Sequence, residues 1–297
     1  MTDIATIELP PLTESTSAAS MKAQRRYVRG TGAYLLLLVG ASFFGVIRLR
    51  LAGPESLDLA ASAALLCFGF SAIVTGFLGS SRPDRTWYDG RAASESVKTL
   101  AWRYAVAGNP FPATSPPNEA DALFTARVAG VIGSLRYAGA AGSYGEQITD
   151  WMRQTRALPL AERRRVYEVG RIEDQQKWYS AKADWNGRRS DLYAMAALGL
   201  TTTGFVLAWL RAVGAMDLDM LEVICAGAAS LGAWMQVKQH DALARAYAVT
   251  AQELARIRSL INTGEAESEW ALFVDGAEDA VSREHTLWLA SRGSSPG

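Results

Sequence analysis

Three charged residues of one predicted helix have the types and spacing that chemistry would need. Arg91, Glu95 and Lys98 recur at helical intervals, so their side chains are able to line a common binding or catalytic site. The same spacing suits ion pairs of Arg91 with Glu95 and of Glu95 with Lys98. Such pairs are more common on helix surfaces than catalytic sites are, so we assign no catalytic residue.

The rest of the sequence contains no recognisable catalytic or metal-binding motif. The two histidines, His240 and His285, lack the spacing of a metal-binding pair. Cys67 and Cys225 each lie in an apolar segment, where a thiol behaves as a small hydrophobic group. Residues 139–145 are glycine-rich, but no strand precedes them and no lysine ends them, which excludes a phosphate-binding loop. We therefore expect a protein that is not an enzyme and uses no metal or cofactor.

Four windows without charged residues are the most prominent elements of the chain. They cover residues 30–47, 59–81, 192–210 and 223–237, which are 18, 23, 19 and 15 residues long. A transmembrane helix needs about 20 apolar residues, within a range of about 17–25. The first three windows reach that length, whereas the fourth is short and rich in Ala and Gly. Short connectors pair the windows into two antiparallel transmembrane hairpins; the alternative is a pair of buried hairpins in a soluble protein.

The charges are balanced overall but unevenly distributed. The 30 basic and 30 acidic residues give a net charge of zero, which does not favour a nucleic-acid partner. Twelve Lys and Arg residues flank the outer ends of the two hairpins, whereas the two connectors contain three. Basic residues are retained on the cytoplasmic side of a membrane. Both termini and the central region should therefore be cytoplasmic.

The predicted fold is an all-α membrane protein with four spans in two hairpins, joined to long amphipathic cytoplasmic helices. The two hairpins look like copies of one module, because Arg25 precedes Arg48 as Arg188 precedes Arg211, at the same offset of 163 residues. The predicted division is a disordered tail at 1–20, a first two-transmembrane module at 21–110, a helical linker region at 111–158, a second module at 159–292 and a disordered end at 293–297.

The predicted spans contain hydroxyl groups but almost no ionisable side chain. Buried charges usually mark proton relays and transport sites, so their absence argues against a proton-coupled transporter. The candidates for lining a pore in an oligomer are Ser42, Ser71, Thr75, Thr201, Thr202, Thr203 and Ser230. The same hydroxyls are equally able to bond between helices or to their own backbone carbonyls.

Two groups of residues outside the spans resemble two subtypes of the SLATT family, the SMODS- and SLOG-associating two-transmembrane effector domains. The first group comprises Trp87, Arg91, Glu95, Lys98 and Trp102. The second comprises Arg171, Asp174, Trp178, Lys182, His285 and Trp288. The two resemblances together cover about residues 21–292, and they mark these side chains as candidate interaction residues of the cytoplasmic helices.

The resemblance implies a role in bacterial conflict or immunity, such as antiphage defence, and brings no catalytic residues or cofactors. We expect an oligomeric pore or another permeability-altering effector in the bacterial inner membrane, triggered by an unidentified ligand or by a nucleotide-signalling partner protein. The expected partners are the lipid bilayer and further copies of the chain, and not nucleic acid. The alternative is a non-conducting membrane-anchored scaffold or sensor whose cytoplasmic helices bind a partner or a nucleotide.

Overall fold

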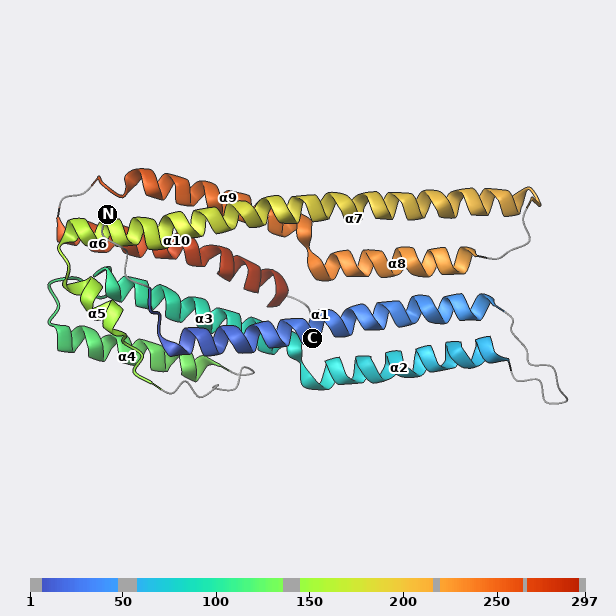
Figure 1. Cartoon of the computed structure of the whole chain (residues 1–297), viewed down its shortest axis with the longest axis horizontal. Helices are drawn as coiled ribbons and strands as arrows, with labels where there is room; N and C mark the ends of the chain where they lie inside the picture. The colour runs from blue at the N-terminus through green and yellow to red at the C-terminus, as the bar shows by residue number, and fades with distance from the viewer. Residues whose placement is uncertain (1–6, 48–57, 136–144, 216–219, 264–265, 294–297) are drawn as a thin grey trace. The chain divides into compact units, whose positions relative to one another are not determined.

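The computed structural model describes residues 7–47, 58–135, 145–215, 220–263 and 266–293, the last eleven of them by backbone only. Within these ranges the secondary structure is helical apart from connecting segments (Figure 1). The helices are α1 Pro11–Val46, α2 Leu59–Ser81, α3 Pro83–Ala105, α4 Pro117–Ser134, α5 Asp150–Ala157, α6 Leu160–Tyr167, the π-helix η1 Glu168–Glu173, α7 Asp174–Ala212, α8 Leu221–Lys238, α9 His240–Leu260 and α10 Glu267–Gly293.

The chain forms two compact units. One, here called the helical body, contains Met1–Ala23, Asp84–Asp184 and Ala244–Gly297. The other, here called the apolar unit, contains Gln24–Pro83 and Trp185–Leu243. The boundary between the units falls within α1, after Ala23, and within α7, after Asp184. Each of these uninterrupted helices therefore contributes residues to both units.

The helix ends follow from local residue chemistry. Asp58 precedes α2, and its carboxylate accepts hydrogen bonds from the otherwise unpaired amides of Ala60 and Ala61. Arg82 ends α2 in the left-handed conformation, with φ of 42°, and Pro83 then begins α3. Thr149 caps α5 through a hydrogen bond from the amide of Met152.

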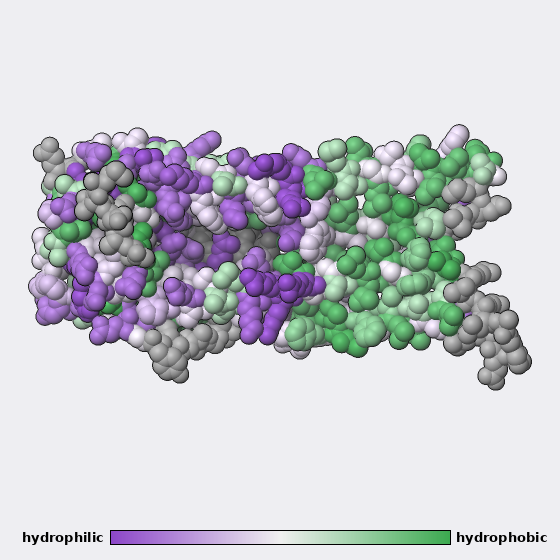
Figure 2. Space-filling model, viewed as in Figure 1, coloured by the Kyte–Doolittle hydropathy of each residue, from purple (hydrophilic) through white to green (hydrophobic). Residues whose placement is uncertain are grey.

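The apolar windows remain exposed within the protein chain. Leu36, Leu65 and Phe205 are 74%, 72% and 73% exposed, and Figure 2 shows hydrophobic residues covering the visible face of the apolar unit. Three described stretches, Pro11–Val46, Leu59–Ala105 and Leu160–Ala212, contain helices long and apolar enough to cross a membrane. Helix α8 carries Glu222 and Lys238 and is not one of them. The all-α fold with membrane-spanning helices is confirmed, and the fourth span stays a prediction.

Close packing within the apolar unit joins its helices in the predicted pairs. A Cβ atom on Gly40 of α1 would lie 3.5 Å from Sγ of Cys67 on α2. A Cβ atom on Gly204 of α7 would lie 3.1 Å from the Ile224 side chain on α8. The indole N–H of Trp234 also donates a hydrogen bond to the Tyr193 hydroxyl at 3.2 Å. Figure 1 shows α1 beside α2 and α7 beside α8.

The prediction of a disordered tail over residues 1–20 is wrong for its second half, because α1 begins at Pro11. Leu12 and Thr16 are both 2% exposed. The Thr16 hydroxyl bonds to the carbonyl of Leu12, and the Ser20 hydroxyl donates to the Trp87 carbonyl at 2.9 Å. Three of the hydroxyl groups that made this segment look disordered, those of Ser15, Thr16 and Ser20, are paired with backbone carbonyls.

Aromatic side chains fill the core of the helical body. The Trp102 ring meets the rings of Trp151 and Tyr167 edge to face, at centroid distances of 5.2 and 5.9 Å. Tyr167 in turn contacts Trp270 at 5.7 Å. Trp102, a candidate interaction residue from the sequence, is only 1% exposed and packs in this core.

A buried histidine joins α7 to α9 within the apolar unit. Nδ1 of His240 lies 2.7 Å from Oδ1 of Asn186, and the imidazole stacks on the Tyr193 ring at 5.6 Å. Burial, followed by the charges of Lys238 and Arg189, lowers the His240 pKa.

We expect acidification to destabilise this contact. The unfolded chain takes up a proton at His240 near its ordinary pKa of about 6.5, whereas the folded chain does so only at lower pH. The stabilisation is therefore present above that value and is lost as the pH falls from the ordinary pKa to the lowered one. The measurement is the thermal midpoint in detergent at about pH 7.5 and about pH 5.5. His240→Gln should lose part of the pH dependence; an unchanged dependence would contradict the assignment.

Candidate functional site

Several predicted interaction residues meet at one polar cavity in the helical body. The cavity has a volume of about 350 Å³, and its walls come from α3, α7 and α10. Its lining residues are Arg91, Glu95, Ser96, Lys98 and Thr99 from α3, Asp174, Gln175, Trp178 and Tyr179 from α7, and Val281 and Ser282 from α10. The helix α3 presents these residues on one face because they recur at intervals of three and four.

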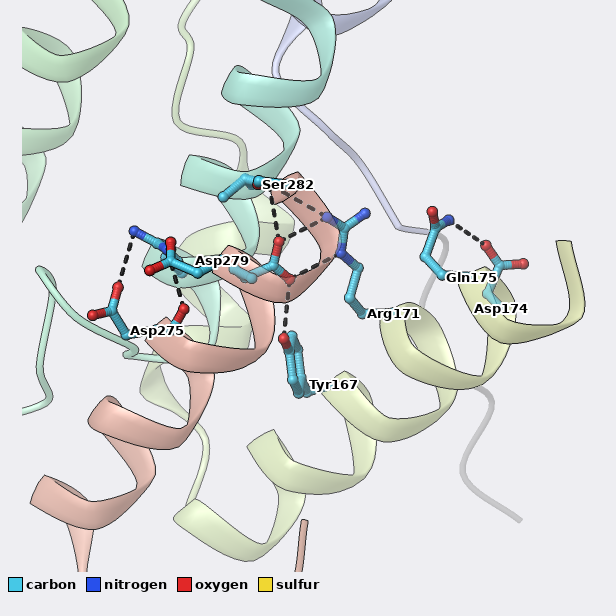
Figure 3. A network of polar contacts seen from close by, with 10 residues as sticks. Tyr167, Arg171, Asp174, Gln175, Asp275, Asp279 and Ser282 are labelled. Carbon is cyan, nitrogen blue, oxygen red and sulfur yellow. Dashed lines mark hydrogen bonds and ion pairs between the residues drawn. The ribbon is translucent and has the colours of Figure 1, made fainter. Parts of the chain in front are cut away.

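A buried ion pair lies directly behind the cavity wall. Arg171 and Glu278 have side chains 1% and 0% exposed, and their closest N–O distance is 2.7 Å. Oε1 of Glu278 accepts hydrogen bonds from Nε of Arg171 and from the Tyr167 hydroxyl, at 2.9 and 3.0 Å. Oε2 accepts from Nη2 of Arg171 and from the Thr99 hydroxyl, at 2.7 and 3.0 Å. Figure 3 shows this network between η1 and α10.

The electrostatics of the network hold Arg171 in its charged form. Burial alone would lower its pKa, but the charge and hydrogen bonds of Glu278 more than compensate, so the Arg171 pKa is raised. Burial and the Glu278 charge also raise the pKa of the Tyr167 hydroxyl, which therefore remains a donor. One donor is left over: Nη1 of Arg171 is buried and has no hydrogen-bond partner among the described residues.

Lys98 is the second cation beside this network. Its pKa is lowered, first by burial and then by the Arg171 charge, although Glu95 and Glu278 oppose the shift. Within the described part of the chain, Nζ of Lys98 forms no hydrogen bond and no ion pair with Glu95 or Asp174. The simple helix-surface pair of Glu95 with Lys98 that the sequence allowed is therefore not formed.

Trp178 forms the aromatic edge of the cavity. Its ring contacts Tyr179 and Tyr247 at centroid distances of 4.9 and 5.6 Å, and 40% of the residue is exposed. The ammonium group of Lys182 lies 5.8 Å from the centre of the same ring. The aromatic neighbours fix the orientation of the Trp178 ring while part of its surface stays accessible.

The other predicted interaction residues lie elsewhere. Trp87 is 8% exposed and Trp102 is in the aromatic core, so neither lines the cavity. Lys182 is not a lining residue of the cavity, and its ammonium group lies against the Trp178 ring. The side chains of His285 and Trp288 lie outside the described residues.

Sequence reasoning missed the acid that organises the network. Glu278 was not singled out, although it follows Ala277 and lies between Val274 and Val281, within the apolar face of the last helix. A carboxylate on an apolar helix face needs a charged partner. That signal would have pointed to a buried cation such as Arg171, although the sequence does not say which one.

The hydroxyl groups proposed to line a pore are mostly bonded to their own helices. The Ser71 hydroxyl donates to the Phe68 carbonyl, and Thr75 donates to Ser71, at 2.8 and 2.9 Å. Thr201 and Thr203 donate to carbonyls in the preceding turn. Ser42 and Ser230 are half-buried, and Thr202 is exposed. These bonds satisfy each hydroxyl proton and leave oxygen lone pairs free, so the pore assignment stays a prediction.

The described residues contain no cluster of three or more His, Cys, Asp or Glu side chains able to hold a metal ion. The cavity itself brings several kinds of polar group together. It presents cations, carboxylates, hydroxyls and one aromatic surface to a small volume. Such a mixture favours binding of a polar ligand with a flat or apolar part.

Two family models match the chain in tandem. Residues 10–164 match SMODS and SLOG-associating 2TM effector domain 3, and residues 167–288 match SMODS and SLOG-associating 2TM effector domain 1. The first match extends over the region predicted as a linker, and the two meet at the end of α6. Neither the curated proteins nor the solved structures contain a match.

Proposed function

Because the chain belongs to the SLATT family, the SMODS- and SLOG-associating two-transmembrane effector domains, with two tandem domains of different subtype, we propose that it is a triggered membrane effector. In this proposal several copies assemble in a bacterial inner membrane and raise its permeability. A signal acts on the helical body and is passed to the apolar unit. The protein performs no catalytic step.

The continuity of α7 is the observation that carries this proposal. Its first residues, Asp174 and Gln175, line the cavity, and the same 39-residue helix continues through the third apolar window to Ala212. A helix transmits displacement and rotation along its length, since its backbone hydrogen bonds make it stiff. A ligand or partner at the cavity is therefore covalently linked to a candidate membrane span by one uninterrupted element.

The apolar exposure of the spans supports the bilayer as the first partner. Side chains such as Leu65 and Phe205 are largely uncovered within the chain, which is the surface expected to face lipid or another subunit. The few spans of one chain are not enough to enclose a wide channel, so conduction requires several copies. The excess of Lys and Arg outside the connectors supports cytoplasmic termini.

We expect induced expression of the full chain to depolarise bacterial cells, and the purified chain to release ions from liposomes once its trigger is present. The measurements are a voltage-sensitive dye in cells and ion efflux from vesicles. Leu65→Arg is the control: it places a charge on the exposed face of α2, at a cost of insertion of about 2.5–3.5 kcal/mol. This variant should neither insert normally nor depolarise.

The alternative function is a membrane-anchored sensor that does not conduct. The bonding of Ser71, Thr75, Thr201 and Thr203 to their own helices favours it, because these hydroxyls have no unpaired proton to offer an ion pathway. Correctly inserted protein that binds a ligand, yet leaves cells polarised and liposomes tight, would reject the pore and retain the sensor.

A further inference from the structure

We propose that the cavity of the helical body binds a small organic anion: Lys98 in the wall and the charge of Arg171 behind the wall attract its charged oxygen atoms, neighbouring carboxylates accept its hydroxyl or amino protons, and Trp178 covers its flat or apolar part. The proposal deepens the proposed function by giving the chemical class of its trigger. Only the ligand's role as a trigger rests on that function, because binding at the cavity is measured independently of permeability.

Arg171 has a hydrogen-bond donor that no group among the described residues uses. The residue is 0% exposed, and its Nε and Nη2 atoms are both committed to Glu278. Nη1 has no partner, which is unusual, since buried donors are nearly always paired. In the view of Figure 3 the guanidinium group of Arg171 lies between Ser282 and Gln175, which are both residues of the cavity wall.

The carboxylate of Glu278 has no oxygen atom left over for that donor. Each carboxylate oxygen of Glu278 already accepts two hydrogen bonds. Asp174 accepts from Gln175 at 3.3 Å. Lys98, which lines the cavity, likewise has no hydrogen bond or ion pair within the described residues. An anionic oxygen group is a partner that Nη1 of Arg171 and Nζ of Lys98 both lack, and hydrogen bonds between charged groups are the strong ones.

The cavity wall also contains acceptors for the uncharged polar groups of the ligand. Arg91 and Lys98 are balanced on the cavity wall by Glu95 and Asp174, so the site does not suit a bare anion. The two carboxylates would instead accept protons from hydroxyl or amino groups beside the charged group. The volume of about 350 Å³ lies within the range of about 300–1,000 Å³ typical of small-molecule sites.

Trp178 supplies the surface for a flat or apolar part. It is 40% exposed, and Tyr179 and Tyr247 hold its ring from two sides. A held ring loses little side-chain freedom when a ligand covers it. A phosphate ester with hydroxyls and a planar group would thus meet every part of the site, whereas inorganic phosphate would meet only the two cations.

The test is calorimetric titration of the full-length protein in detergent with three probes: inorganic phosphate, glycerol 3-phosphate and adenosine 5′-monophosphate. We expect the two esters to bind more tightly than inorganic phosphate. Lys98→Met should weaken ester binding by about tenfold or more, because one charge-assisted hydrogen bond is lost. Lys177→Met is the matched control, since Lys177 on α7 pairs with Glu173 at 2.7 Å and lies outside the cavity. It should leave binding unchanged.

A second variant separates the two kinds of ester. Trp178→Ala should weaken the binding of adenosine 5′-monophosphate more than that of glycerol 3-phosphate, because only the former has a planar group. Thermal midpoints of all variants show that they are folded. The proposal is overturned if none of the probes binds at millimolar concentration, or if folded Lys98→Met binds them as the unsubstituted protein does. Binding without any change in ion efflux would instead reject the pore and leave the site intact.

Discussion

Replacing Glu278 by glutamine should destabilise the helical body more than any other single change to a carboxylate of the described chain. The substitution leaves Arg171 charged and fully buried, without a counter-ion and with its hydrogen bonds to the carboxylate weakened. Breaking a buried pair in this way costs about 3–5 kcal/mol. For a unit of this size the thermal midpoint should fall by about 6–20 °C, measured by circular dichroism in detergent.

Asp279→Asn is the matched control for this experiment. Asp279 is the next residue of α10 and also pairs with an arginine, Arg103, at 2.6 Å, but its side chain is 67% exposed. Solvent screens such a pair, so its loss should cost about 1 kcal/mol or less. Equal shifts for the two variants would contradict the assignment. Replacing Arg171 and Glu278 together by apolar residues should recover much of the loss, because no uncompensated charge remains.

Trp102→Ala should be the second strongly destabilising change. The Trp102 side chain fills the space between Trp151 and Tyr167, and it lies so close to Gly170 that a Cβ atom there would be 3.0 Å from the ring. Its truncation removes this contact area and leaves a cavity, at a cost of about 3–5 kcal/mol. The measurement is again the thermal midpoint.

Trp178→Ala is the control for Trp102→Ala because both remove an indole from the helical body. Trp178 is 40% exposed, so its truncation removes less buried area and opens no enclosed cavity. We expect a clearly smaller loss of stability. A Trp102→Ala protein as stable as Trp178→Ala would mean that the core packs differently from the arrangement described.

The membrane-spanning character was predictable from the sequence because it depends on composition along the chain. Uncharged windows as long as residues 59–81 and 192–210 are typical of membrane-spanning helices, and the helices α2 and α7 contain them. The fourth window was the weakest of the four by length, and α8 indeed carries charged residues at both ends. The helical spacing of Arg91, Glu95 and Lys98 likewise predicted a common face of one helix, and all three side chains line the cavity.

The buried network was not predictable in the same way. Arg171 was a candidate interaction residue together with Asp174 and Trp178, yet its side chain is enclosed. Whether a charge at a given helical position faces solvent depends on which helix packs against it. Here α10, more than a hundred residues later, supplies Glu278. The helical segment at residues 11–20 was missed for a similar reason, because the carbonyl that pairs with Ser20 belongs to Trp87.

The π-helix η1 determines how the residues of α7, which follow it, are oriented about the helix axis. A π-helical turn accommodates one residue more than an α-helical turn, and one residue of α-helix corresponds to about 100° of rotation. Tyr167 before η1 and Arg171 within it both reach Glu278, while Asp174 after it reaches the cavity. Rewinding η1 as regular α-helix would rotate α7 about its axis. Asp174, Gln175 and Trp178 would then no longer lie opposite the cavity residues of α3. The six residues Glu168–Glu173 are therefore the place where a small change in winding becomes a large change in which face of α7 is presented along its whole length.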